Sequence, residues 1–154
     1  MTGVVHHSFT IERRFGCTPH QTFSAFSDPE LKRQWFANPG NWPDGVWELD
    51  FRVGGGEVNS GGSPGGPQHA FRSRFHDIVA GERIVFAYDL LIDHRLISVS
   101  LTTIEFVPDG RGTRLAFTEQ GAFFDRFEDR AIREHGTGKL LDRLDGFLAQ
   151  EHPR

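Results

Sequence analysis

The sequence predicts an α+β fold, in which a curved antiparallel sheet of six or seven strands packs against one long C-terminal helix. Two short helices are expected after the first strand. Apolar residues recur at every second position over much of the chain, as on half-buried strands. After Phe123 the spacing changes to that of an amphipathic helix. The layers follow because a sheet and a helix each bury one face against the other.

The first strand is predicted over residues 8–15, where Phe9 and Ile11 alternate with polar residues. Two short helices follow, each marked by a capping residue and a proline at the first helical position. The two start signals are Thr18 with Pro19 and Asp28 with Pro29. The apolar faces of the two helices are formed by Phe23 and Phe26 in the first and by Leu31 and Trp35 in the second.

The next strand is predicted over residues 47–53, where Trp47, Leu49 and Phe51 alternate with charged residues. Residues 54–67 then contain seven of the 18 glycines. Only 53 residues precede this stretch, and strand patterns lie on both sides of it. We therefore interpret it as the flexible tip of a long hairpin and not as a linker between domains.

Alternation predicts a meander of further strands, separated by turns at residues 80–82 and 108–112. These strands cover residues 71–76, 84–88, 95–107 and 114–119. The last element is a long helix over residues 123–151. Its predicted inward stripe consists of Phe127, Ala131, Glu134 or His135, Gly138, Leu141, Leu144 and Phe147 or Leu148.

Composition limits the class of protein. The 154 residues, with a net charge of −4 and a pI near 6.0, indicate a single domain over 1–154 with an ordered core over about 8–150. The charge lacks the basic excess typical of nucleic-acid and anionic-membrane binding, so neither partner is expected. Cys17 is the only cysteine, which excludes an intrachain disulfide. With no signal peptide or membrane span in the sequence, we expect a cytoplasmic protein.

The order of elements and several motifs resemble the START-like helix-grip (SRPBCC) superfamily. More narrowly, the chain resembles the heat-shock-protein-90 ATPase activator-homologue (AHSA-like) family, from about Phe9 to Leu148. The motifs that carry the resemblance are Thr18-Pro19, Phe26, Asp28-Pro29, Trp35, the Arg-Val-Gly-Gly of 52–55 and the REHGTGKLLDRLDGFL segment near the C-terminus.

The resemblance implies a deep apolar cavity between the curved sheet and the C-terminal helix, which the family uses for lipids, polyketides or other hydrophobic small molecules. It implies no shared catalytic motif and no cofactor. Many members carry Trp after the helix glycine, where this chain has Thr137. Members that activate the chaperone ATPase have an additional N-terminal domain, whereas this chain begins at the first strand, so a chaperone partner is a minor expectation.

The candidate cavity residues are those that the predicted faces direct inward. They are Trp35, Phe36, Trp42, Phe71, Phe75, Phe86, Tyr88, Phe117, Glu119, Phe127 and His135. Three of them are polar groups among apolar ones, as in small-molecule sites. The alternatives are that Glu119 and Tyr88 are strand-end residues whose tips reach water, and that His135 bonds a backbone carbonyl. Trp35, Phe36 and Trp42 either line the cavity or plug its end.

The sequence lacks the motifs that would indicate a metal site or a phosphate-binding loop. The eight histidines show neither an HExxH motif nor a pair at helical i, i+4 spacing, so no metal site is expected. The glycine-rich stretch lacks the Gly-Lys-Ser/Thr ending of a phosphate-binding loop. Glu48 and Asp50 share a strand face, but the apolar residues between them take the core side, which leaves this pair in solvent.

Three functions remain open from the sequence. The first is binding of a hydrophobic small molecule between sheet and C-terminal helix, without catalysis. The second is a cyclase- or hydratase-type enzyme that uses Glu119, Tyr88 or His135 as acid or base in the same cavity. The third is a protein-interaction module related to chaperone ATPase activation. A homodimer is compatible with each, because an exposed strand edge needs protection.

Overall fold

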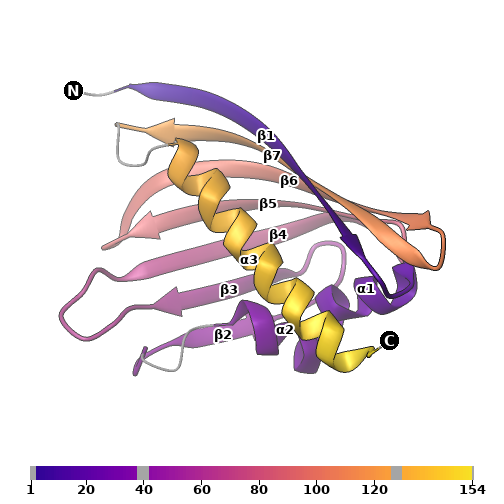
Figure 1. Ribbon diagram of the computed structural model, residues 1–154. Helices are drawn as coiled ribbons and strands as arrows, with labels where there is room; N and C mark the ends of the chain where they lie inside the picture. The colour runs from indigo at the N-terminus through magenta and orange to yellow at the C-terminus, as the bar shows by residue number, and fades with distance from the viewer. Residues whose placement is uncertain (1–2, 38–41, 126–129, 154) are drawn as a thin grey trace.

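The computed structural model describes residues 3–37, 42–125 and 130–153. A seven-stranded antiparallel sheet curves around one long helix, and two short helices lie at one end of the same face (Figure 1). The strands are β1 (Val4–Phe15), β2 (Val46–Leu49), β3 (Gly56–Gly61), β4 (His69–Val79), β5 (Arg83–Ile92), β6 (Arg95–Asp109) and β7 (Gly112–Phe124). The helices are α1 (Pro19–Ser27), α2 (Pro29–Phe36) and α3 (Arg130–Glu151).

The strand order is β1-β7-β6-β5-β4-β3-β2, so consecutive strands are neighbours from β2 to β7, and β1 closes the far edge beside β7. This is the predicted helix-grip arrangement. β1 is longer than predicted because it pairs with β7 along its whole length, from Val4 opposite Phe124 to Phe15 opposite Thr113. Within the described residues, no helix is both long and apolar enough to cross a membrane.

Both short helices begin where the capping signals predict. The Thr18 hydroxyl accepts a hydrogen bond from the Gln21 backbone N–H, and the Gln21 side chain accepts one from the Thr18 N–H, which completes a capping box. The Asp28 carboxylate accepts a hydrogen bond from the Glu30 N–H at the start of α2. These caps set the sharp turn that brings α1 and α2 across the end of the sheet.

The glycine-rich stretch differs from the prediction. Residues 56–61 form strand β3, which pairs with β2 on one side and β4 on the other, so the stretch is not one hairpin tip. Sequence alternation does not reveal this strand, because its inward positions carry the polar residues Glu57 and Asn59. Glu57 is nevertheless buried, where the buried Lys32 ammonium and the half-buried Trp47 indole donate to it.

The strand before it is shorter than the predicted 47–53. β2 ends at Leu49, and Phe51 lies in the turn that follows. The Phe51 ring still packs on the core, edge-on to Phe23 and Phe75, with ring centroids 5.7 and 5.0 Å apart. Val53 is exposed, so the apolar face of this segment ends at Phe51.

Helix α3 also differs from its prediction, both in where it starts and in which face it buries. Residues 123 and 124 belong to β7, and the helix begins at Arg130. The buried positions are Arg133, Thr137, Leu141, Leu144, Phe147 and Leu148. The predicted stripe was therefore wrong over its first half, where it assigned Ala131 and His135 to the interior. A buried arginine replaces them, because its charge is paired inside the protein.

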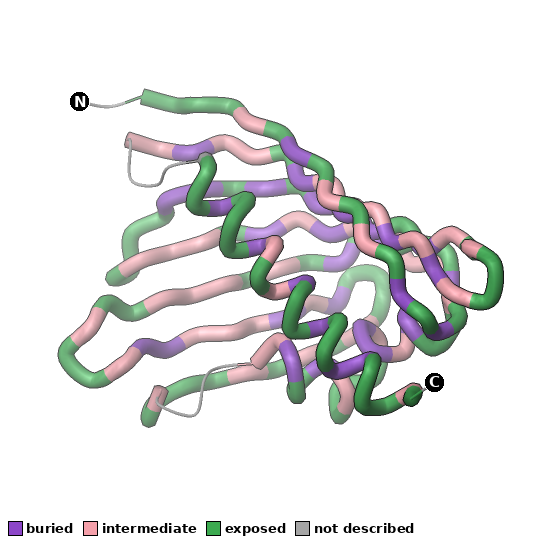
Figure 2. Tube along the Cα trace, in the orientation of Figure 1, coloured by how far each residue is buried: buried purple, intermediate pink, exposed green. Residues whose placement is uncertain are grey.

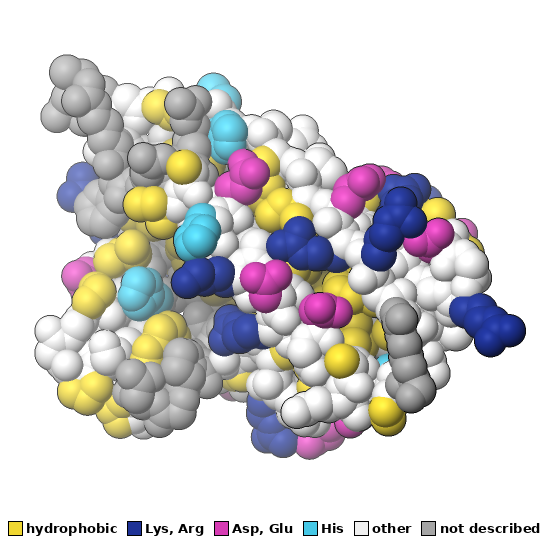
Figure 3. All heavy atoms as spheres, viewed as in Figure 1, with side chains coloured by type: hydrophobic (Ala, Val, Ile, Leu, Met, Phe, Trp, Pro, Cys, Tyr) yellow, Lys and Arg dark blue, Asp and Glu magenta, His cyan; other side chains and the backbone are white. Residues whose placement is uncertain are grey.

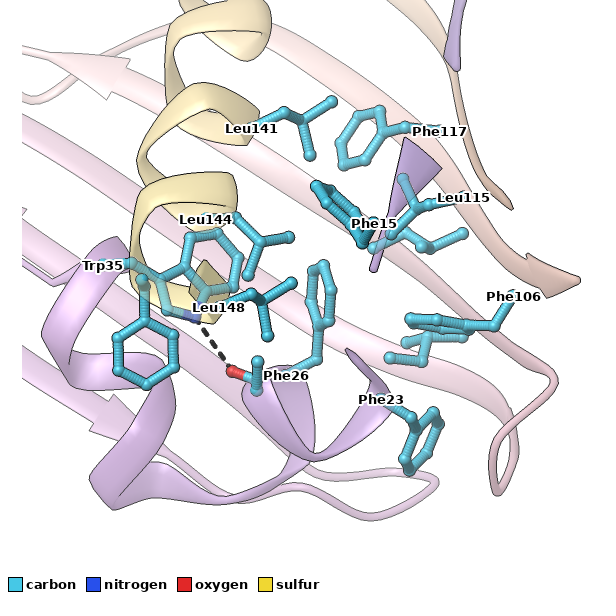
Figure 4. Close-up of a cluster of buried hydrophobic side chains, with 14 of the residues drawn as sticks. Phe15, Phe23, Phe26, Trp35, Phe106, Leu115, Phe117, Leu141, Leu144 and Leu148 are labelled. Carbon is cyan, nitrogen blue, oxygen red and sulfur yellow. Dashed lines mark hydrogen bonds between the residues drawn. The ribbon is translucent and has the colours of Figure 1, made fainter. Parts of the chain in front are cut away.

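The two halves of α3 contact the rest of the protein differently. Its C-terminal half packs into a solid apolar core, where Leu144 and Leu148 point toward Phe26 and Trp35 (Figure 4). The Trp35 indole N–H donates to the Ala25 carbonyl at 3.0 Å, which locks α2 against α1. Buried positions thus recur along the inner side of the helix while its outer side is exposed (Figure 2). The N-terminal half of α3 instead covers a cavity.

Candidate functional site

A cavity of about 400 Å³ lies between α3, α2 and the concave face of the sheet. Its walls are mostly aromatic and aliphatic, and the rings of Phe36, Phe71 and Tyr88 follow one another edge-on or tilted, with centroids 5.4 and 4.7 Å apart. Ile132 lies at its rim on α3 and is 63% exposed. The Phe-rich composition therefore forms both a solid core at one end of the sheet and the wall of a chamber at the other.

Most of the side chains predicted for the cavity lie in its wall. These are Trp35, Phe36, Phe71, Phe86, Tyr88, Phe117 and Glu119. Alternation along β5 and β7 places Tyr88 and Glu119 on the concave face, where each is less than a tenth exposed. The alternative, that their polar tips reach water, is wrong for both. Trp35 and Phe36 line the cavity, and Trp35 also closes its end against α1.

Three predicted residues lie elsewhere. Phe75 is buried in the core, against Phe51 and Phe86, and is not part of the cavity wall. Trp42 stacks on His69 with ring planes 3° apart, and neither ring lines the cavity. His135 is exposed on the outer side of α3, two positions from the buried residues Arg133 and Thr137. The remaining candidate, Phe127, lies outside the described residues.

The innermost polar group of the cavity is a buried ion pair that joins α3 to the sheet. The Arg133 Nη1 lies 3.1 Å from the Glu119 Oε2, with both side chains less than a tenth exposed. The Tyr88 hydroxyl lies between them, donating to the Glu119 Oε1 at 2.8 Å and accepting from Arg133 at 2.9 Å. Ser100 donates to the same carboxylate, and Arg133 Nη2 reaches the Ser98 hydroxyl at 2.6 Å. This dense bonding compensates the burial of both charges.

The phenol of Tyr88 is held in its neutral form by this environment. Burial, reinforced by the neighbouring negative charge of Glu119, raises the pKa of Tyr88 above its usual value of 10.0. The positive charge of Arg133 opposes the shift but does not cancel it. The hydroxyl is therefore a hydrogen-bond donor to Glu119 at any physiological pH.

A second buried ion pair lies on the α2 side of the cavity. The Lys32 Nζ is 2.6 Å from the Glu57 Oε1, and the two side chains are 5% and 2% exposed. The Trp47 indole N–H donates to the other Glu57 oxygen at 3.0 Å. Lys32 itself lines the cavity, and its ammonium lies 4.5 Å from the centroid of the Phe36 ring.

One row of the sheet links the two ion pairs. Strand register places Glu57 opposite Ser73, Ser73 opposite Tyr88, and Tyr88 opposite Ser100. Because directly paired residues in antiparallel strands point to the same face, these four polar side chains form a line across the floor of the fold. Aromatic rings flank the line on both sides, since Phe71 and Phe75 precede and follow Ser73 on the same face of β4.

Sequence reasoning missed the two cations, Lys32 and Arg133, although signals for both exist. Lys32 precedes Trp35 and Phe36 by three and four residues, which places it on the same helical face as these rings. Extending the Leu141, Leu144 and Leu148 stripe backwards at helical spacing leads to Thr137 and Arg133. Neither cation is among the candidate residues, because a charged residue is seldom buried without a partner.

A metal centre finds no support in the described part of the chain, where no group of three or more His, Cys, Asp or Glu side chains is placed to hold an ion. On the face covered by α3, acidic and basic side chains are intermingled, with apolar side chains between them (Figure 3). The polar side chains that line the cavity include Lys32, Asn59, Glu119 and Arg133.

Comparison with known proteins identifies the family of this chain. Residues 16–149 match the model of the Activator of Hsp90 ATPase homolog 1-like protein family. The chain belongs to this family. A crystal structure of a protein from Rhizobium loti is 43% identical, covers 94% of this chain and 99% of its own, and superimposes with a TM-score of 0.88. An uncharacterised protein from Rhizobium leguminosarum is 39% identical, covers 97% and 99%, and has a TM-score of 0.92.

A more distant relative from Chromobacterium violaceum is 26% identical over 92% of this chain and 96% of its own, with a TM-score of 0.74. The comparison with curated proteins found no match. Thr137 is 8% exposed and lines the cavity, so a small side chain stands in the wall at this point.

Proposed function

We propose that the protein binds a hydrophobic small molecule in the cavity between the sheet and α3. The observation that carries the proposal is the cavity itself, about 400 Å³ in volume and walled mainly by Phe, Trp, Leu and Ile side chains. Ligand pockets commonly measure roughly 300–1,000 Å³ and combine an apolar wall with a few polar groups. Each buried methylene of a ligand would contribute roughly 0.8 kcal/mol of transfer free energy.

The way α3 is held supports the proposal. Its C-terminal half is anchored by Leu141, Leu144 and Leu148 in the core, whereas Arg133 and Thr137 are the buried positions of its N-terminal half. Arg133 joins this half to the sheet by a network of polar contacts. The helix therefore covers the cavity without filling it, which leaves a preformed apolar chamber for a ligand.

The same contacts weigh against the cyclase or hydratase alternative. A general acid or base needs a proton or a lone pair directed at the substrate. The Tyr88 hydroxyl donates a hydrogen bond to Glu119 and accepts one from Arg133, while the Glu119 carboxylate accepts from Tyr88, Ser100 and Arg133. His135, the third candidate for this role, is exposed on the other side of α3. The chaperone-related alternative rests on the family alone and stays a prediction.

Cavity filling tests the proposal. The probe is N-phenylnaphthylamine, an uncharged dye whose fluorescence rises in apolar surroundings. We expect the wild-type protein to bind it, and Thr137→Trp to weaken binding by about tenfold or more, since an indole at this position occupies the space of the ligand. Leu90→Trp fills the cavity from the opposite wall and should act in the same way.

The matched control is His135→Trp, which adds the same ring to the same helix on its exposed side. This variant should bind the dye as the wild type does. Circular dichroism establishes that each variant is folded before its affinity is compared. If all three variants bind the dye equally well, the chamber is not the binding site, and a wild-type protein that binds no apolar probe would sink the proposal.

A further inference from the structure

The Lys32 ammonium has hydrogen-bonding capacity that the protein does not use. An ammonium group has three N–H donors. In the described part of the chain, the one hydrogen-bond acceptor of Lys32 is the Glu57 Oε1. The side chain is 5% exposed and lines the cavity, where its nearest aromatic neighbour is the Phe36 ring. Part of its donor capacity therefore remains for a molecule in the cavity.

The opposite polar group of the cavity is bonded more completely. The Tyr88 oxygen both donates and accepts, and the Glu119 carboxylate accepts three hydrogen bonds. Arg133 donates to Tyr88, Glu119, Ser98 and Ser100. Of the two buried cations, Lys32 thus has one hydrogen-bond acceptor among the described residues, whereas Arg133 has four.

The charge balance at Lys32 decides which acceptor fits. Lys32 and Glu57 neutralise each other, and both are buried. A ligand carboxylate next to them would leave one uncompensated negative charge in an apolar chamber, which is costly. An uncharged carbonyl oxygen adds an acceptor without adding charge. A hydrogen bond from a charged donor is also stronger than one between neutral groups.

We infer that the cavity binds an uncharged apolar molecule that bears a carbonyl group, with the Lys32 Nζ donating to the carbonyl oxygen. The inference rests on the proposed function, because it assigns the ligand class and its orientation in the same chamber. The carbonyl lies at the α2 side of the cavity, and the apolar body lies along the rings of Phe36, Phe71 and Phe86. Lys32 is then a specificity-determining residue.

Two ligands of nearly equal shape test the inference. Acetylnaphthalene carries a carbonyl where ethylnaphthalene carries a methylene, and naphthoic acid supplies the charged analogue. We expect the wild-type protein to bind the ketone more tightly than the carboxylate. The ratio of the ethylnaphthalene Kd to the acetylnaphthalene Kd should fall about tenfold when Lys32 is removed, which corresponds to the loss of one charge-assisted hydrogen bond.

The variant for this comparison is the double substitution Lys32→Met with Glu57→Gln, which removes the ion pair without leaving a buried charge. The glutamine side chain keeps an oxygen that can accept from the Trp47 indole. A second measurement uses the wild-type protein alone, so that the test does not depend on the stability of the variant. The carbonyl carbon of labelled acetylnaphthalene should resonate further downfield when bound to the protein than in an alkane solvent, as a hydrogen-bonded ketone does.

The outcomes separate the inference from the proposed function. An unchanged Kd ratio in the double variant, or an alkane-like carbonyl resonance in the wild-type complex, overturns the role of Lys32 while the chamber still binds apolar molecules. Failure of all three naphthalene compounds to bind overturns the proposed function together with the inference. A lowered ratio together with a downfield resonance supports the assignment of Lys32.

Discussion

Arg133 of α3 and Glu119 of β7 form an ion pair inside the protein, with Nη1 and Oε2 3.1 Å apart and neither side chain more than 7% exposed. The two residues are 14 positions apart in the sequence, and the pair joins the helix to the floor of the cavity. Tyr88 completes the contact from β5. This ion pair thus holds the N-terminal half of α3 to the sheet beside the cavity, where no apolar core joins them in the described part of the chain.

Breaking this pair from one side should be strongly destabilising. Glu119→Gln leaves Arg133 as a buried cation without its counter-charge, a change that typically costs about 3–5 kcal/mol of unfolding free energy. Arg133→Met should cost a similar amount. The double variant should be less destabilised than the sum of the two, because neither charge is left alone. Urea denaturation of the four proteins measures this coupling.

The matched control is an exposed pair of similar geometry. Arg14 Nη1 lies 2.7 Å from Asp109 Oδ2, but the Arg14 side chain is 73% exposed. Arg14→Met should therefore change stability by about 1 kcal/mol or less. Equal losses in Arg14→Met and Arg133→Met would contradict the idea that burial makes the inner pair important.

Tyr88 should resist ionisation in the folded protein. It is the only tyrosine of the chain, so the ultraviolet absorbance of tyrosinate reports on this residue alone. Because burial raises the pKa of Tyr88 above its usual value of 10.0, the absorbance should not rise as the pH passes that value while the protein stays folded. Ionisation at the usual pH without unfolding would contradict the buried position.

The raised pKa of Tyr88 also makes the free energy of unfolding fall as the pH rises above 10. Between the ordinary and the raised pKa of Tyr88, the unfolded chain has lost the phenolic proton and the folded protein has kept it. Folding therefore binds a proton in this range, and the free energy of unfolding falls by up to about 1.4 kcal/mol per pH unit above pH 10. Below pH 10 this contribution is fully present. Tyr88→Phe should show a shallower decline when both proteins are titrated in urea.

Gly146 offers a stabilising substitution. It lies within α3 at an exposed position, and a Cβ added there would meet nothing within 4 Å. Gly146→Ala should raise the free energy of unfolding by about 0.5–1 kcal/mol, because alanine restricts the unfolded chain and favours the helix. Thermal unfolding checks this change. A lower midpoint for Gly146→Ala would show that the helix needs glycine at this position.

Much of the fold is predictable from local patterns. Period-two alternation located β1, β4, β5, β6 and β7, and the Thr18 and Asp28 caps located the starts of α1 and α2. Alternation also placed Glu119 and Tyr88 on the concave face. These features depend on neighbours within a few residues, which is why sequence spacing is enough to find them.

The polar half of the site is not predictable in this way. β3 was missed because Glu57 points inward, and Arg133 because a charge on a helix is usually solvated. Each is buried by virtue of a partner on another element, Lys32 for Glu57 and Glu119 for Arg133. Residue spacing within one element contains no information about such a partner.

Local periodicity and composition are enough to define the layers of this protein, the faces of most of its strands and the aromatic character of its interior. They do not distinguish the Phe rings that close into a core from those that surround a chamber, because that outcome depends on how α3 lies over the sheet. Leucines bring its C-terminal half into contact with the core, whereas the longer, charged Arg133 joins its N-terminal half to Glu119 and Tyr88 and leaves space beside them.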